Sequence, residues 1–259
     1  MIKNYLKEIE SSLRKKLGVH IPAIGMIPKF DSVAGVELAG SQLLKFLLRI
    51  VLNRKNEDLW IVFAGKTGAG KSSLINLLFE PEVKLKVGKG MPGTTEPYTG
   101  TLHLGDRGKI KYTDLPGIGE SKYSSEINNE ITLKFLQESD LVIWLFKSDD
   151  TAKHSEQILI DRLSPKIKEK IIFGVSQVDK ASGNWYIKEN KPSISQIEHI
   201  NNRINDIAKT FKIPKDKIVD FSTSRKYNID LLMNMMINSI SDKGDILRHK
   251  ILDNSNETR

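Results

Sequence analysis

Residues 59–79 read LWIVFAGKTGAGKSSLINLLF and contain the pattern G-x-x-x-x-G-K-S at positions 65–72. An apolar run precedes the pattern and a run with helical periodicity follows it, so the stretch predicts a strand, a glycine-rich loop and a helix. Glycines let backbone N–H groups come close to phosphate oxygens, and the N-terminus of the following helix adds positive potential. Lys71 is expected to reach the β- and γ-phosphates, and Ser72 to offer its hydroxyl to Mg²⁺. The stretch therefore predicts a nucleoside triphosphate site, without indicating the base or the reaction.

Short apolar runs alternate with helical periods after this loop, which predicts an α/β sheet. Strands are expected at 59–64, 98–104, 109–114, 141–147, 171–176 and 218–221, and helices at 71–79, 125–137, 151–163, 193–211 and 229–239. Only residues 105–108 separate the second and third strands, and four residues are too few for a helical crossover. This pair must therefore be an antiparallel hairpin within a mixed, mostly parallel sheet.

Composition bounds the class of protein. The chain has 259 residues, of which 39% are hydrophobic and 28% charged, so low-complexity disorder is excluded. Forty Lys and Arg against 32 Asp and Glu give a net charge of +8, which fits RNA or an anionic lipid surface as partner and equally fits solubility alone. The absence of cysteine excludes disulfides and thiol chemistry, and the five histidines show no ligand spacing. No signal peptide or spanning helix is evident, so a cytoplasmic protein is expected.

Three segments are expected along the chain. Residues 1–58 form a helical N-terminal extension, with an amphipathic first helix and a second, more apolar helix at about 36–52. Residues 59–241 form the nucleotide-binding domain, and residues 242–259 a C-terminal tail. The second helix of the extension is apolar enough to pack on its own domain, on a second copy of the chain or on a membrane surface.

Two motifs after the phosphate loop suit a metal and a γ-phosphate. Asp114-Leu115-Pro116-Gly117 ends the third strand, where the Asp114 carboxylate can hold Mg²⁺ through water and the Gly117 N–H can sense a γ-phosphate. The loop before the hairpin contains Thr94 and Thr95, and a threonine there can complete the Mg²⁺ shell. Thr95 is the preferred candidate, and a plain Pro-Gly turn is the alternative.

Two further motifs suit a purine base. Ser176-Gln177-Val178-Asp179 follows the fifth strand, and the Asp179 carboxylate can accept hydrogen bonds from N1 and N2 of guanine, a donor pair that adenine lacks. The alternative is an aspartate that caps the next turn. Phe221-Ser222-Thr223-Ser224 follows the last strand, and the backbone N–H groups of Ser222 and Thr223 are candidates to bind the guanine oxygen.

The ordered set GKTGAGKS, PGTTEP, DLPG, SQVD and FSTS resembles the five G motifs of translation-factor-type GTPases. Within them it is most similar to the Era/MnmE/septin-like branch, and DLPGIGES and SDLVIWLFKSDDTA with Trp185 resemble bacterial YfjP-like GTPases. The resemblance covers about residues 59–240 and implies a three-layer P-loop GTPase domain that hydrolyses GTP to GDP with Mg²⁺. It implies Lys71, Thr95 and Gly117 as catalytic residues and Ser72, Thr95 and Asp114 around the metal. The nucleotide-binding residues that it implies are Lys66, Thr67, Gly68, Ala69, Gly70, Lys71, Ser72, Ser73, Gln177, Asp179, Lys180, Ser222 and Thr223.

Three departures from the family pattern qualify this expectation. Ile118 follows Gly117 where Ras-like enzymes have a water-orienting glutamine, so slow intrinsic hydrolysis is expected. Gly68 stands where potassium-activated relatives carry an asparagine, which leaves potassium stimulation open. Ser176 and Gln177 replace the Asn-Lys pair of the fourth motif, so guanine selectivity depends on Asp179.

Two other functions stay open at this point. A P-loop ATPase or small-molecule kinase would need no base-reading aspartate, so Asp179 argues against it. A GTP-gated oligomerising or membrane-associated module resembling immunity-related GTPases fits the N-terminal extension. A nucleotide-dependent homodimer is one candidate partner arrangement. RNA, the ribosome and a membrane surface are others, and only the net charge and one apolar helix support them.

Overall fold

The computed structural model describes residues 58–79, 85, 96–103, 109–118, 125–150 and 154–240. The strands are β1 (Leu59–Gly65), β2 (Tyr98–His103), β3 (Lys109–Asp114), β4 (Leu141–Lys147), β5 (Ile171–Ser176), β6 (Trp185–Tyr186), β7 (Lys191–Pro192) and β8 (Ile218–Asp220). The α-helices are α3 (Lys71–Leu78), α4 (Ser125–Glu138), α5 (His154–Asp161), α6 (Pro165–Glu169), α7 (Ile194–Phe211) and a helix over residues 229–240. The expected extension 1–58, its helix at 36–52 and the tail 242–259 lie outside these ranges, apart from residue 58.

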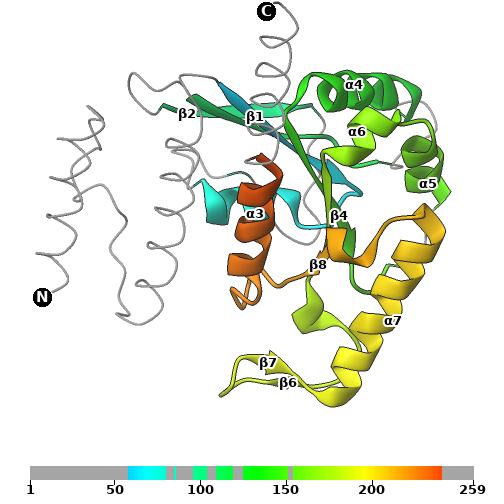
Figure 1. Ribbon diagram of the computed structural model, residues 1–259. Coiled ribbons are helices and arrows are strands. Elements are labelled where there is room, and N and C mark those ends of the chain that lie inside the picture. Colours follow the sequence, from blue (N-terminus) through cyan, green and yellow to red (C-terminus); the bar gives the residue numbers. More distant parts are fainter. Residues whose placement is uncertain are drawn as a thin grey trace, which may run out of the picture.

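Six strands form one twisted sheet in the order β2-β3-β1-β4-β5-β8, and β6 and β7 form a separate hairpin (Figure 1). β1 pairs in parallel with β3 and β4, and β4, β5 and β8 continue in parallel. β2 runs antiparallel to β3, with Tyr98 opposite Asp114 and His103 opposite Lys109. The mixed sheet and the hairpin predicted from the short connection are therefore confirmed.

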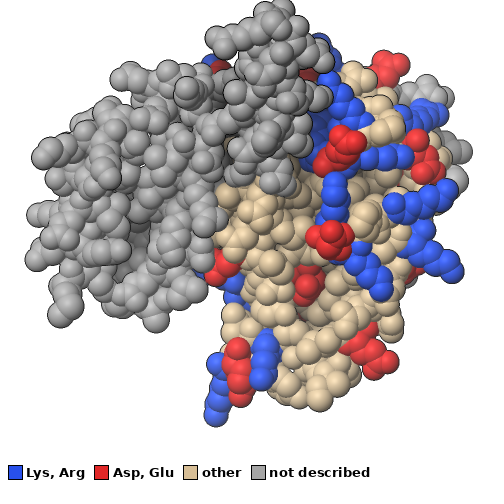
Figure 2. All heavy atoms as spheres, viewed as in Figure 1, with Lys and Arg blue, Asp and Glu red and all other residues tan. Residues whose placement is uncertain are grey.

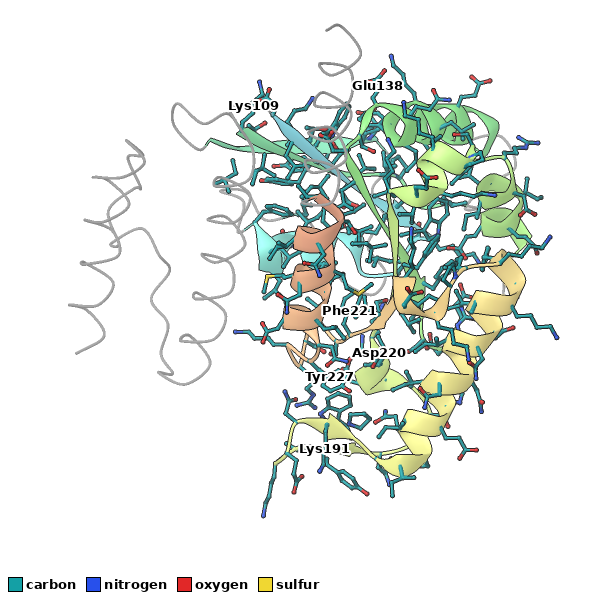
Figure 3. The ribbon with its side chains drawn as sticks, in the orientation of Figure 1. Lys109, Glu138, Lys191, Asp220, Phe221 and Tyr227 are labelled. Atoms are coloured by element: carbon teal, nitrogen blue, oxygen red, sulfur yellow. The ribbon has the colours of Figure 1, made fainter. Side chains whose placement is uncertain are left out.

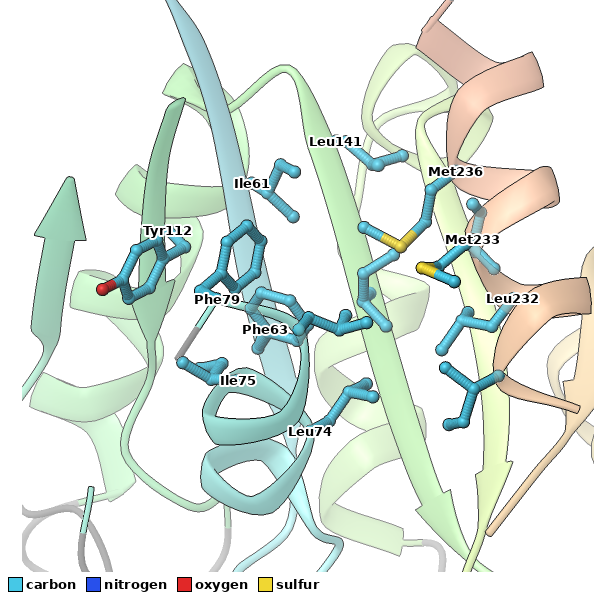
Figure 4. Packing of buried hydrophobic residues seen from close by; sticks show 14 of the residues in the cluster. Ile61, Phe63, Leu74, Ile75, Phe79, Tyr112, Leu141, Leu232, Met233 and Met236 are labelled. Atoms are coloured by element: carbon cyan, nitrogen blue, oxygen red, sulfur yellow. The ribbon is translucent and has the colours of Figure 1, made fainter. Parts of the chain in front are cut away.

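Helices cover both faces of this sheet and bury two apolar clusters. On one face, α3 and the helix over 229–240 pack against alternate residues of β1, β3 and β4, including Ile61, Phe63 and Tyr112 (Figure 4). On the other face, α4, α5, α6 and α7 pack against the remaining residues, with Trp144 of β4 fully buried. Such burial on both sides explains why the central strands β1 and β4 read as continuous apolar runs in the sequence.

The structure differs from the sequence-based prediction in two helices that cover the sheet and in one hairpin. The helix expected at 151–163 appears as α5 (His154–Asp161), and α6 follows as a separate helix that was not predicted. Ser164 caps α6 by accepting a hydrogen bond from the Ile167 N–H, and Pro165 occupies its first turn. The β6–β7 hairpin was also missed, because two-residue strands carry no readable alternation.

All parallel strands end at the same edge of the sheet, and the loops after β1, β3, β4, β5 and β8 meet there. These loops contain the phosphate-loop pattern and the motifs at 114–117, 176–179 and 221–224. Among the described residues, no helix is both long and apolar enough to cross a bilayer.

Candidate nucleotide site

The loop between β1 and α3 has the backbone of a phosphate cradle. Gly65, Gly68 and Gly70 have φ angles of 129°, 75° and 88°, a region that residues with a Cβ atom rarely adopt. At Gly65 a Cβ would also lie 2.3 Å from the Leu145 carbonyl oxygen of β4. Gly70 is the N-cap of α3 and makes no side-chain cap bond, so no cap side chain stands between the start of this helix and an anion.

Lys71 lies at the base of this cradle with 6% of its surface exposed. Its Nζ donates to the Gly65 carbonyl at 3.0 Å and to the Lys66 carbonyl at 3.1 Å. Two carbonyl oxygens therefore hold the ammonium group in place at the base of the loop.

The Lys66 side chain takes a different direction from the one expected for a phosphate ligand. Its Nζ lies 3.2 Å from Asp150 Oδ2 and 3.9 Å from Glu156 Oε2, on the side of β4 and α5. Its backbone carbonyl supports Lys71, but its ammonium group is directed to carboxylates because two of them lie beside the loop.

Ser72 and Asp114 come together as a hydroxyl and carboxylate pair. The Ser72 hydroxyl donates to Asp114 Oδ2, and Asp114 is fully buried at the end of β3. Oxygen donors of these two kinds are those that Mg²⁺ uses in phosphate sites, so the residues present fit that ion. Thr95, the expected third contributor, lies outside the described residues. Within the described ranges, no group of three or more His, Asp and Glu side chains is arranged so that it could hold a metal ion.

Gly117 packs directly on the phosphate loop. The Ile118 N–H donates to the Gly65 carbonyl at 3.4 Å, and Lys66 and Ile118 form a parallel β-bridge. A Cβ on Gly117 would lie 1.7 Å from Thr67 Oγ1 and 2.6 Å from the Thr67 backbone nitrogen. The structure therefore requires a glycine here for steric reasons. Ile118 is 6% exposed and belongs to the core beside α4.

We expect Gly117→Ala to lower the free energy of unfolding of the nucleotide-free protein by about 1–3 kcal/mol, the usual cost of overpacking. The added methyl group must displace Thr67, and denaturant unfolding measures the loss. Thr67→Ala is the matched reference, and the double variant should recover part of the loss because Oγ1 is the nearest atom. Equal stability of Gly117→Ala and the wild type would contradict this contact.

The fourth motif is bonded to the phosphate loop. The Ser176 hydroxyl donates to the Ala69 carbonyl at 2.7 Å, and Ser176 is 1% exposed. Gln177 has a φ of 58°, and its Nε2 donates to the Gly68 carbonyl at 2.6 Å. Lys180 Nζ donates to Gln177 Oε1 at 2.9 Å. Ser176 and Gln177 therefore connect the loop after β5 to the phosphate loop. This role of Ser176 was not predicted from the sequence.

Asp179 is held by two hydroxyl groups. Ser222 Oγ donates to Asp179 Oδ1 at 2.6 Å, and Ser224 Oγ donates to Oδ2 at 2.9 Å. Each carboxylate oxygen has a second lone pair, so both can still accept hydrogen bonds from a base. The Ser222 N–H donates to the Tyr227 carbonyl at 3.1 Å, which leaves Thr223 as the better candidate for a backbone contact to guanine. Ser224 was not predicted, because its role depends on the fold of the loop.

The β6–β7 hairpin supports the loop that follows β8. Trp185 packs edge-on against Tyr227 at 5.2 Å between ring centroids, and Asn190 Nδ2 donates to the Arg225 carbonyl at 2.9 Å. Tyr227 lies close to Asp220 and Phe221 at the end of β8 (Figure 3). Burial raises the pKa of the Asp220 carboxyl. The tryptophan noted in the sequence therefore contacts the loop that follows the last strand.

The fold and the site together define a P-loop nucleotide-binding domain with a mixed sheet and a carboxylate, that of Asp179, in the loop after β5. Residues 60–177 match the family described as 50S ribosome-binding GTPase, so this stretch, which includes the phosphate loop, is similar to the P-loop GTPase domain of that family.

Three curated relatives are similar to this chain. The Escherichia coli (strain K12) protein YkfA is 31% identical over 195 residues, which are 74% of this chain and 65% of YkfA. YfjP of the same strain is 36% identical over 137 residues, or 51% of this chain and 47% of YfjP. GTPase Era of Ureaplasma parvum serovar 3 is 26% identical over 180 residues, or 69% of this chain and 54% of Era. The chain thus spans about half to two thirds of the length of these relatives.

Two solved structures share the fold. Toc33 from Arabidopsis thaliana, in complex with Mg²⁺ and GMPPNP, has a TM-score of 0.58 at 16% identity, with 79% of this chain and 93% of Toc33 covered. Era from Aquifex aeolicus bound to GDP and AlF4⁻ has a TM-score of 0.54 at 22% identity, with 71% and 57% covered. At these identities the likeness supports the fold alone.

Proposed function

We propose that this chain binds GTP and GDP with Mg²⁺ and hydrolyses GTP slowly, as a nucleotide-dependent switch. The observation that supports it best is the Asp179 carboxylate, held by Ser222 and Ser224 at the same sheet edge as the Lys71 cradle. A carboxylate can pair with the two adjacent donors of guanine, whereas adenine would leave it desolvated and unpaired. A P-loop ATPase or kinase has no need of this group.

Different residues of the site serve phosphate binding, metal binding and the response to the γ-phosphate. The phosphate loop, from Lys66 through Ser73, surrounds the phosphates with backbone N–H groups, and Lys71 stabilises charge that develops on the β- and γ-phosphates. Ser72, Asp114 and Thr95 would hold Mg²⁺, which when bound neutralises phosphate charge. The Gly117 N–H and Thr95 respond to the γ-phosphate. This assignment rests on two contacts: Lys71 Nζ donates to the Gly65 carbonyl, and the Ser72 hydroxyl donates to Asp114.

Slow turnover follows from Ile118. Its side chain is apolar and buried, so it cannot orient a water molecule by hydrogen bonding. The attacking water must then be positioned by a backbone group, another side chain or a partner. This part of the proposal predicts low intrinsic hydrolysis and stimulation by a partner.

A nucleotide-dependent homodimer is the partner arrangement that we propose first. For the chloroplast translocon components atToc33 and psToc159, dimerization is important for the GTPase activity.

A solved structure of Era contains nucleotides of 16S ribosomal RNA, but the described residues visible in Figure 2 mix Lys and Arg with Asp and Glu. That face offers no single-sign basic field for RNA. A cytoplasmic location, expected from the sequence, is part of the same proposal.

The test is a titration with fluorescent GDP and Mg²⁺, competed separately by GDP and ADP. We expect GDP to compete at a concentration at least about 100-fold lower than ADP, because two charge-assisted hydrogen bonds to the base are lost with adenine. Competition by ADP alone, or equally by both, would contradict guanine recognition and turn attention to ATPases and kinases.

A further inference from the structure

A cluster of charged side chains lies beside the phosphate loop, and its carboxylates have no part in the function proposed above. Lys66 of that loop faces Asp150, which follows β4, and Glu156 in the first turn of α5. Trp144 Nε1 of β4 donates to Glu156 Oε1 at 3.4 Å. Glu156 is only 2% exposed, whereas Lys66 and Asp150 are 17% and 29% exposed. A glutamate buried at such a place is rare unless it is paired.

A cation from α7 also acts on this cluster. Arg203 is 8% exposed, and its Nη1 lies 3.3 Å from Asp206 Oδ2, an exposed partner. Its charge favours the ionised form of Glu156, as does that of Lys66, and Asp150 opposes it. The groups that act on Glu156 therefore come from the phosphate loop, β4, the segment after β4 and α7.

The protonation of Glu156 is balanced near neutral pH. Burial raises the pKa of its carboxyl from an ordinary 4.5 to about 7, although Lys66 and the Trp144 hydrogen bond act to lower it. When Glu156 is neutral, Lys66, Arg203 and Asp150 leave one net positive charge in the cluster. When Glu156 is ionised, the four groups sum to zero. Asp206 and Asp149 lie further out and are paired with Arg203 and Lys147.

We propose that Glu156 is a positioning residue of the phosphate site, which acts through Lys66 and Asp150 to set the charge beside the phosphate loop and so makes the affinity for a nucleoside diphosphate depend on pH. The inference rests on the proposed function, because it needs GDP in the loop. Glu156 touches Lys66 and not the nucleotide, so its effect passes through the lysine and the backbone that supports Lys71.

The direction of the effect follows from linkage. An anion bound in the loop disfavours a second negative charge nearby, so GDP binding raises the pKa of Glu156 further and takes up part of a proton near pH 7. GDP therefore binds more tightly below the pKa of Glu156 than above it. We expect the affinity to be about three- to tenfold higher at about pH 6 than at about pH 8, the size expected of one charge at a partly screened site.

The experiment compares the full chain with Glu156→Gln and with Glu198→Gln, which removes an exposed glutamate on α7 as a matched control. Fluorescent GDP with Mg²⁺ is titrated between about pH 6 and about pH 8, and calorimetry in buffers of different ionisation enthalpy measures proton uptake. Glutamine keeps the acceptor for Trp144 but cannot ionise. We expect Glu156→Gln to keep the tight, low-pH affinity throughout and to lose the proton uptake, and Glu198→Gln to behave as the wild type. The titration of GDP itself is common to all three proteins and cancels in the comparison.

Lys66→Gln provides a second, independent test, which also applies if Glu156→Gln does not fold. Because Lys66 favours the ionised form of Glu156, its removal should move the midpoint of the pH dependence above that of the wild type. GDP binding with the same pH profile in the wild type and Glu156→Gln, or an unmoved midpoint in Lys66→Gln, would overturn the inference and leave the proposed function intact. Failure of the wild type to bind GDP at any pH would overturn both.

Discussion

Replacing Lys71 with alanine is expected to lower the affinity for GDP by at least about 30-fold, since truncating a buried charged partner of a phosphate costs about 2–5 kcal/mol. Lys71 is 6% exposed and is held by the Gly65 and Lys66 carbonyl oxygens, so its ammonium group is already in place before a phosphate arrives. Alanine removes the charge and leaves both carbonyl oxygens without this donor. Titration with fluorescent GDP and Mg²⁺ measures the loss.

Lys66→Gln is the matched control for this prediction, because it changes a lysine of the same loop. The Lys66 side chain is directed to Asp150 and Glu156, away from the cradle, so its loss should lower the affinity by less than about tenfold. Thermal unfolding of both variants without nucleotide shows whether each is folded. Wild-type turnover in Lys71→Ala would exclude the phosphate-loop assignment.

The sheet could be predicted from the sequence because its strands are buried on both faces. β4 and β5 were predicted with their observed ends, since an uninterrupted apolar run bounded by polar residues has few other interpretations. The ends of β3, whose sequence KIKYTD is mostly polar, were also predicted as observed. The antiparallel β2–β3 pair followed from the length of one connection. By contrast, α6 was missed although Ser164 and Pro165 carry a cap signal, because the whole helix has only five residues and its period is too short to read.

The chemistry of the site could be predicted motif by motif, but the contacts between motifs could not. Ser176 and the Ala69 carbonyl are 107 positions apart and meet only because β5 ends beside the phosphate loop. The charged cluster was hidden for the same reason, since nothing local distinguishes Glu156 from an exposed glutamate in a first helical turn. Its burial and its contact with Lys66 depend on α5 packing over β4.

The Asp179 carboxylate offers the most specific test of the proposed function. Asp179→Asn is expected to weaken GDP binding by about 100-fold or more, as two charge-assisted hydrogen bonds at about 1.5 kcal/mol each are lost or reversed. Xanthine has an acceptor where guanine has its amino group, so an amide N–H at position 179 suits it. The variant should therefore bind XDP more tightly than the wild type does, and its preference should move from GDP toward XDP.

Ser222 and Ser224 determine how far Asp179→Asn moves the preference from GDP to XDP. Both hydroxyl groups donate to the Asp179 carboxylate, and asparagine offers only one acceptor oxygen, so one hydroxyl must rotate to accept from the new amide. Ser224→Ala is the matched control: it removes one supporting bond without changing the base-reading group, and it should weaken GDP and XDP binding alike, by less than about tenfold. Competition of fluorescent GDP by GDP, XDP and ADP in the three proteins separates the two effects. If Asp179→Asn still prefers GDP, the carboxylate does not read the base, and the two serines hold it for a structural purpose.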